Sequence, residues 1–218
     1  MADKEVPVII PSVLPKEKLD SLINLIWKTA GYPHWIIPIC GQASAAVNRN
    51  KGLDEAGSAE MVVMLDDDVE PINHGWFRIL INALSRHNVL MVSAQLYKPG
   101  GGYAYMTGLQ DWGGLCKESG ETVVPTKRLL TACCAFKPLG GRFDEGYIGS
   151  GFEDVDISNQ LSQRDTNGLF IVCHDAHVIH RNEQREQGGE NWTKNKALYE
   201  SKWGRVETRE ELRRKFRI

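Results

Sequence analysis

Three carboxylates stand side by side at Asp66, Asp67 and Asp68, directly after the apolar run from Met61 to Leu65. Adjacent carboxylates repel one another unless a cation compensates their charge. A divalent metal ion that also holds a diphosphate would provide this compensation. Taken by itself, however, an Asp-x-Asp triplet is also typical of a solvated turn or of the N-cap of a following helix.

A second acidic cluster, which contains Glu153, Asp154 and Asp156, opens a segment with a helical pattern at 152–161. Ser150 and Glu153 have the S-x-x-E spacing of a capping box, which gives Glu153 a structural role. Asp154 is then left to act as a general base, because the helix dipole favours an ionised carboxylate in the first turn. The alternative is that Asp154 only complements this dipole.

Three histidines, His174, His177 and His180, follow the apolar run from Leu169 to Cys173. Alternation along an extended segment puts His174 and His180 on one face and His177 on the other. We therefore expect that they do not all bind one metal ion. Each of them can also be a packed or surface histidine.

The elements that must position these side chains alternate between strand and helix in the first half of the chain. Short apolar runs predict strands, and apolar residues spaced i, i+3, i+4, i+7 predict helices. The expected strands are 6–10, 35–40, 61–65 and 89–97, and the expected helices are 19–26, 43–56 and 76–84. Connections too long for hairpins imply βαβ units and a mostly parallel sheet.

The second half begins with an irregular segment, 98–125, which contains seven glycines and predicts a functional loop. Further strands are expected at 129–136 and 169–173, and further helices at 152–161, 194–203 and 207–216. The length of 218 residues suits one domain, and 42% hydrophobic with 25% charged residues is an ordinary globular composition.

Charge and cysteine content limit the environment and the partners. The net charge of −2 gives no general signal for nucleic-acid binding, although residues 181–218 hold 11 Lys and Arg against 7 Asp and Glu. Five cysteines without CxxC spacing predict reduced thiols that fill the core. The charged N-terminus and the lack of an apolar run near ~18 residues predict a cytoplasmic protein without a membrane span.

Further motifs join the two acidic clusters and the last histidine in a fixed order. They are Pro11-Ser12, Asn48 to Gly52 with Ala56, Asp66 to Asp68 followed by Gly75-Trp76, Gly140 to Glu145, Phe152 to Asp156, Val178 to His180, and Lys202 to Gly204. In this order and spacing they resemble family 2 glycosyltransferases, the large inverting family with the GT-A fold. The resemblance spans nearly the whole chain.

The resemblance implies a single α/β domain of the GT-A type, with a mixed, mostly parallel central sheet flanked by helices. Residues 1–97 are then a Rossmann-like nucleotide-binding half, and 98–180 an acceptor-binding and catalytic half. Residues 181–218 would form a lid and C-terminal helices. The polar segment 181–191, with Gly188-Gly189, is the expected lid over a bound donor.

The resemblance also implies the roles of individual residues. Asp154 is expected to be the catalytic base, and Asp66, Asp68 and His180 to bind Mn²⁺ or Mg²⁺. The expected donor-binding residues are Pro11, Ser12, Arg49, Asp66, Asp67 and Glu153. An imidazole beside oxygen ligands favours Mn²⁺. UDP-sugar is the default donor, but Cys40-Gly41-Gln42 stands where relatives commonly carry an acidic D-G-S turn.

Several alternatives stay open. The acceptor can be a glycan or a glycolipid, or a hydroxymethylated pyrimidine in DNA, as for small enzymes of tailed phages; the cell is then a bacterium or a phage-infected host. A sugar nucleotidyltransferase is a more distant alternative, since the segment from Pro11 to Pro15 lacks the glycines of a phosphate loop. A non-catalytic module that binds nucleotide-sugar is the alternative from another class.

Overall fold

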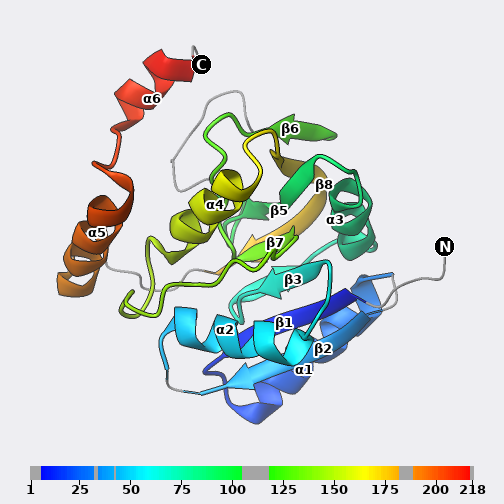
Figure 1. Cartoon of the computed structure of the whole chain (residues 1–218). Coiled ribbons are helices and arrows are strands. Elements are labelled where there is room, and N and C mark those ends of the chain that lie inside the picture. Colours follow the sequence, from blue (N-terminus) through cyan, green and yellow to red (C-terminus); the bar gives the residue numbers. More distant parts are fainter. Residues whose placement is uncertain (1–5, 32–33, 42, 105–117, 182–188, 217–218) are drawn as a thin grey trace.

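One mixed sheet forms the centre of the molecule (Figure 1). The computed structural model describes residues 6–31, 34–41, 43–104, 118–181 and 189–216. The strands are β1 (Val6–Ser12), β2 (His34–Cys40), β3 (Val62–Leu65), β4 (Val69–Pro71), β5 (Val89–Tyr97), β6 (Glu121–Val123), β7 (Cys133–Phe136) and β8 (Leu169–His180). The helices are α1 (Lys16–Thr29), α2 (Ala45–Ala56), α3 (Trp76–Leu84), α4 (Glu153–Arg164), α5 (Glu190–Trp203) and α6 (Arg209–Phe216).

The sheet order is β2-β1-β3-β7-β5-β8-β4, with β6 paired to β8 outside this path. The longer strands pair in parallel, β1 with β2 and β5 with β8, and β3 is also parallel to β1. The short strands β4, β6 and β7 pair antiparallel with their neighbours. This confirms the predicted α/β class with a mixed central sheet and flanking helices.

The core lies on both sides of this sheet, because β3 and β7 are buried along their whole length and β5 up to its last residue. Helix α1 buries Leu19, Leu22 and Ile26, which is the apolar stripe that its spacing predicts. Helix α2 approaches β1 so closely that a Cβ at Gly52 would lie 2.1 Å from Ile9 Cγ2. Only glycine fits there, so Gly52 sets the distance between α2 and the sheet.

Two features of the second half differ from the prediction. Strand β7 begins only at Cys133, because the chain before it turns toward β3, where Ala132 O accepts the backbone N–H of Asp66 at 2.8 Å. Strand β8 extends seven residues further than predicted, to His180, because β4 and β6 pair with its two ends. Neither short strand was predicted, and β6 lies in the segment expected to be a loop. Residues 105–117 of that segment lie outside the described residues.

The cysteine prediction is confirmed at Cys133, Cys134 and Cys173, which are buried free thiols. It is wrong at Cys40, which is exposed at the carboxyl end of β2. Cys116 lies outside the described residues. Among the helices that the structure describes, none is both long and apolar enough to cross a membrane.

Candidate functional site

The carboxyl ends of β1 and β3 lie at the same edge of the sheet, because the two strands are parallel. Asp67 joins them: its Oδ2 accepts hydrogen bonds from Ser12 Oγ at 2.8 Å and from Val13 N at 2.9 Å. Pro11 is the neighbouring residue on β1 and pairs with Ile39 of β2. This edge is where open α/β sheets bind their ligands.

Asp66, Asp68 and His180 form a cluster at this edge. One ligand atom from each residue lies within 4.8 Å of the others. The pairing of β4 with β8 produces this arrangement, since it sets Val69 opposite His180 and lets Arg181 N donate to Asp68 O at 2.9 Å. His180 Nε2 then lies 3.3 Å from Asp68 Oδ1.

The ligand atoms of this cluster fit a divalent cation. Apart from this 3.3 Å contact, Asp68 Oδ1 and both ring nitrogens of His180 are buried without a hydrogen-bond partner among the described residues. Buried polar atoms are normally paired, so the unpaired atoms of Asp68 and His180, which converge beside Asp66, fit a site that binds a cation. Two carboxylates and one imidazole suit Mn²⁺ or Mg²⁺.

The other two histidines of β8 lie elsewhere. His174 is buried, with Nδ1 at 2.7 Å from Gln95 Oε1 and Nε2 at 2.9 Å from Thr122 Oγ1. The ring of His177 lies edge-on against Tyr97. The register between β5 and β8 shifts between Cys173 and His177. Burial nevertheless alternates from His174 to His180, with His174 and His180 buried and His177 half-buried, as the sequence predicts.

Arg49 lies between the two acidic clusters. Its Nη2 donates to Asp66 Oδ1 at 2.8 Å, and its Nη1 donates to Glu153 Oε1 at 3.0 Å and to Asp154 Oδ1 at 3.1 Å. The Arg49 side chain is only 2% exposed, and its guanidinium also faces the ring of Phe143. Although burial disfavours the charge, the three carboxylates raise the pKa of Arg49 above its usual value, so the side chain stays cationic.

The start of α4 differs from the predicted capping box. The N-cap is Phe152, with a left-handed φ of 72°, and its side chain makes no capping hydrogen bond. Ser150 therefore does not cap the helix, and this prediction is wrong. Glu153 is 1% exposed and bonds Arg49 and the backbone N–H of Gly151 instead. A bulky residue with positive φ is strained, which indicates that the surroundings fix this turn.

Asp154 is held at one oxygen. Its Oδ1 accepts hydrogen bonds from Arg49 and from the hydroxyl of Thr131, and its side chain is 14% exposed. Thr131 is fully buried and was not singled out from the sequence. In the sequence, the feature that could have drawn attention to Thr131 is that it is the one hydroxyl residue in the otherwise apolar run 129–136. The described hydrogen bonds of the Asp154 side chain all fall on Oδ1.

Asp156, the last acidic residue of its cluster, is surrounded by side chains that hold the fold together. It is fully buried, and it accepts hydrogen bonds from Tyr147 OH at 3.1 Å, Trp203 Nε1 at 2.6 Å and Gln160 Nε2 at 2.7 Å. Lys202 adds an ion pair. Burial and the Asp156 carboxylate raise the pKa of Tyr147 above its usual value, so the phenol stays a donor. Asp156 thus anchors α5, which is the orange helix to the left of α4 in Figure 1.

Replacing Asp156 with Asn is expected to lower the free energy of unfolding by about 2 to 3 kcal/mol, because it removes one partner of a buried ion pair. Urea unfolding followed by tryptophan fluorescence measures this. Asp20→Asn is the matched control, since Asp20 pairs with Lys16 on the exposed surface of α1, where a change below ~0.5 kcal/mol is expected. Equal stability of the two variants would contradict the anchoring role.

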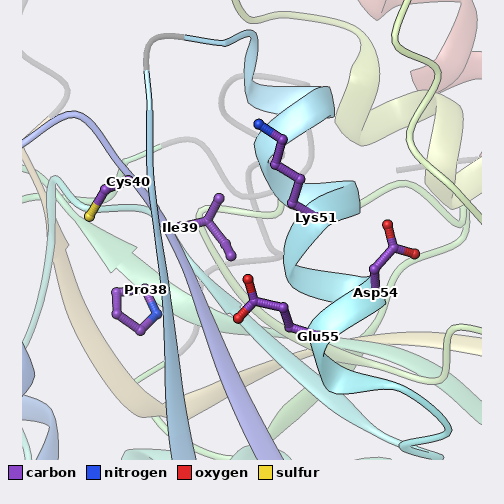
Figure 2. Close-up of a pocket in the computed structure, with 6 residues that line it drawn as sticks. All are labelled: Pro38, Ile39, Cys40, Lys51, Asp54 and Glu55. Atoms are coloured by element: carbon purple, nitrogen blue, oxygen red, sulfur yellow. The ribbon is translucent and has the colours of Figure 1, made fainter.

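A shallow hollow lies apart from this site, between β2 and α2 (Figure 2). It is lined by Pro38, Ile39 and Cys40 from β2 and by Lys51, Asp54 and Glu55 from α2. Its lining includes none of the residues of the acidic clusters. The hollow is therefore separate from the acidic clusters.

The predicted lid at 181–191 falls mainly on residues 182–188, which lie outside the described residues. Its first residue, Arg181, forms a two-point ion pair with Glu70, at 2.8 Å and 2.7 Å. This hydrogen-bonded pair lowers the pKa of Glu70. It joins β4 to the end of β8, next to His180. Glu190 and Asn191 already belong to α5.

Comparisons with known proteins agree on the fold. No protein-family profile matches the sequence, and no curated protein matches it. Among solved structures, GalNAc-T7 with UDP, GalNAc and Mn²⁺ superposes with a TM-score of 0.63 and 17% identity over 91% of this chain and 48% of that chain. The present chain thus spans about half of the GalNAc-T7 structure.

Two further structures give similar values. Staphylococcus aureus TarS 1–349 in complex with UDP-GlcNAc has a TM-score of 0.64 and 13% identity over 98% of this chain and 73% of that chain. The mannosyltransferase PcManGT from Pyrobaculum calidifontis, in complex with GDP-Man and Mn²⁺, has a TM-score of 0.58 and 14% identity over 89% and 61%. The chain has the GT-A fold of these glycosyltransferases.

Proposed function

We propose that the protein is a metal-dependent, inverting glycosyltransferase that moves a sugar from a nucleotide-sugar to an acceptor hydroxyl. The observation that carries this proposal is the cluster of Asp66, Asp68 and His180 at the carboxyl edge of a GT-A sheet. Asp154 faces the same network, because Arg49 contacts both Asp66 and Asp154.

Asp66, Asp68 and His180 would hold the cation through two carboxylates and one imidazole. A divalent cation bound there would neutralise the negative charge that develops on a nucleoside diphosphate leaving group. The end of β1, with Pro11 and Ser12, would line the nucleoside site. Asp67 would support this site indirectly, since its carboxylate holds Ser12 Oγ and Val13 N in place.

Asp154 would act as the general base through Oδ2, while Arg49 and Thr131 hold Oδ1. As the acceptor oxygen attacks the anomeric carbon, its proton passes to Asp154. The bond from this carbon to the diphosphate oxygen breaks, and the electron pair leaves with the nucleoside diphosphate. One displacement from the opposite side inverts the anomeric configuration. A positioned base accounts for ~10² to 10⁴ in rate.

The related structures contain UDP, UDP-GlcNAc and GDP-Man, which supports a nucleotide-sugar as the donor class. UDP-sugars are the first choice, by resemblance. The acceptor classes that we propose to compare are glycans, glycolipids and hydroxymethylated pyrimidine in DNA. We also propose a cytoplasmic location, as the sequence predicts.

The direct test is a donor-hydrolysis screen of the purified chain with UDP-, GDP- and dTDP-sugars in the presence of Mn²⁺ or Mg²⁺. We expect slow release of the nucleoside diphosphate from one donor, because water replaces the acceptor. The three acceptor classes are then added in turn. The class that accelerates this release identifies the acceptor. NMR of the product then reports the anomeric configuration.

Two outcomes of this screen would contradict the proposal. If the chain binds nucleotide-sugar but never releases nucleoside diphosphate with any acceptor, it is a non-catalytic binding module. If it instead forms pyrophosphate from a nucleoside triphosphate and a sugar phosphate, it is a nucleotidyltransferase.

A further inference from the structure

Arg49 contacts each half of the proposed site with a different nitrogen. Nη2 binds Asp66 of the cation cluster, and Nη1 binds Glu153 and the proposed base Asp154. The Arg49 side chain is 2% exposed and that of Glu153 is 1% exposed, so neither offers much surface to a bound donor. Their burial does not suit the direct donor contacts that the family resemblance implies for them.

The charges in this network act on the cation cluster and on the base in different ways. A positive charge in contact with Asp66 competes with a metal cation for the same carboxylate, and burial strengthens this competition. The same guanidinium fixes the direction of the Asp154 carboxylate through its planar fork. Arg49 therefore lowers the affinity for a cation while it orients the base.

We propose that Arg49 is a positioning residue that orients Asp154 and moderates the hold of Asp66 on the cation, and that it is not a donor ligand. The part that concerns Asp154 rests on the function proposed above. The part that concerns the cation does not depend on catalysis, because Mn²⁺ binding can be measured on the protein alone.

Arg49→Gln separates these two effects, since it removes the charge and keeps a polar side chain. We expect this variant to bind Mn²⁺ about tenfold more tightly in the absence of donor, which corresponds to one pKa unit of electrostatic interaction. Its kcat should fall roughly 100-fold, as for a small misplacement of a reacting group. Its donor KM should change by less than about threefold, because Arg49 does not touch the donor.

Arg49→Lys is the second variant, which keeps the charge and loses the fork. We expect near-normal Mn²⁺ affinity and a kcat reduced roughly 10- to 100-fold. The matched control is Arg86→Gln, because Arg86 pairs with Glu121 on the surface, 2.7 Å apart, away from both acidic clusters. Titration calorimetry with Mn²⁺, steady-state kinetics and circular dichroism give the three readouts.

If the role of Arg49 were purely structural, its replacement would weaken Mn²⁺ binding and turnover together. A folded Arg49→Gln protein with weaker Mn²⁺ binding would therefore overturn the charge part, and normal kcat in both Arg49 variants would overturn the positioning part. If Arg49→Gln does not fold, a normal kcat of Arg49→Lys alone overturns the proposal. If the wild-type chain turns over no donor, the proposed function fails, while the Mn²⁺ affinities still test the charge effect.

Discussion

Asp154→Asn is expected to lower kcat by roughly 10² to 10⁴, because the amide cannot accept the proton of the acceptor hydroxyl. The shape of the side chain is kept, and the amide oxygen can still accept from Arg49 and Thr131, which now hold Oδ1. Donor affinity should change by less than about threefold, since the proposed nucleoside contacts lie at the end of β1. Steady-state kinetics and donor titration measure both quantities.

Glu153→Gln provides the comparison with the neighbouring carboxylate. The sequence predicts a mild capping effect at Glu153, but this residue is buried and paired with Arg49, so we expect a loss of about 2 kcal/mol in stability. Its kcat should fall much less than that of Asp154→Asn. Near-normal turnover of Asp154→Asn, or a dead Glu153→Gln that remains folded, would mean that the base has been assigned to the wrong residue.

The fold was largely predictable because strongly periodic segments carry their own signal. The apolar runs of β1 and β5 and the helical stripe of α1 were found in their correct types and near their correct bounds. The pairing partners carry no such local signal. Strands β4 and β6 are three residues long, and they form only because β8 offers an edge at each of its ends.

The composition of the site was predictable, but its connections were not. Asp66, Asp68 and His180 were named from motif order, and the structure brings their ligand atoms together. The contact of Arg49 with Asp154 links positions 105 residues apart, and no spacing in the sequence encodes it. The positive φ of Phe152 likewise depends on tertiary contacts, including rings of Trp192 and Tyr199 that pack against it.

The histidines of β8 give the sharpest test of the cation site, since His174 and His180 are both buried on one strand and differ in their neighbours. His180→Ala is expected to weaken Mn²⁺ binding at least ~100-fold, because the loss of an outer-shell partner alone typically costs 10- to 100-fold. His180 is buried but makes no described hydrogen bond, so this variant should lose less stability than His174→Ala. Turnover should fall toward the level measured for the wild-type chain in EDTA, which we expect to be near zero.

His174→Ala is the matched control, because it removes a ring that bonds Gln95 and Thr122 and does not reach Asp68. It should lower the free energy of unfolding by about 2 to 4 kcal/mol, through a cavity and two unpaired polar groups. Its Mn²⁺ affinity, titrated on the folded protein without donor, should stay within about threefold of wild type. Equal losses of Mn²⁺ affinity in the two variants would show that His180 is not a ligand, and full wild-type turnover in excess EDTA would show that the reaction needs no divalent cation.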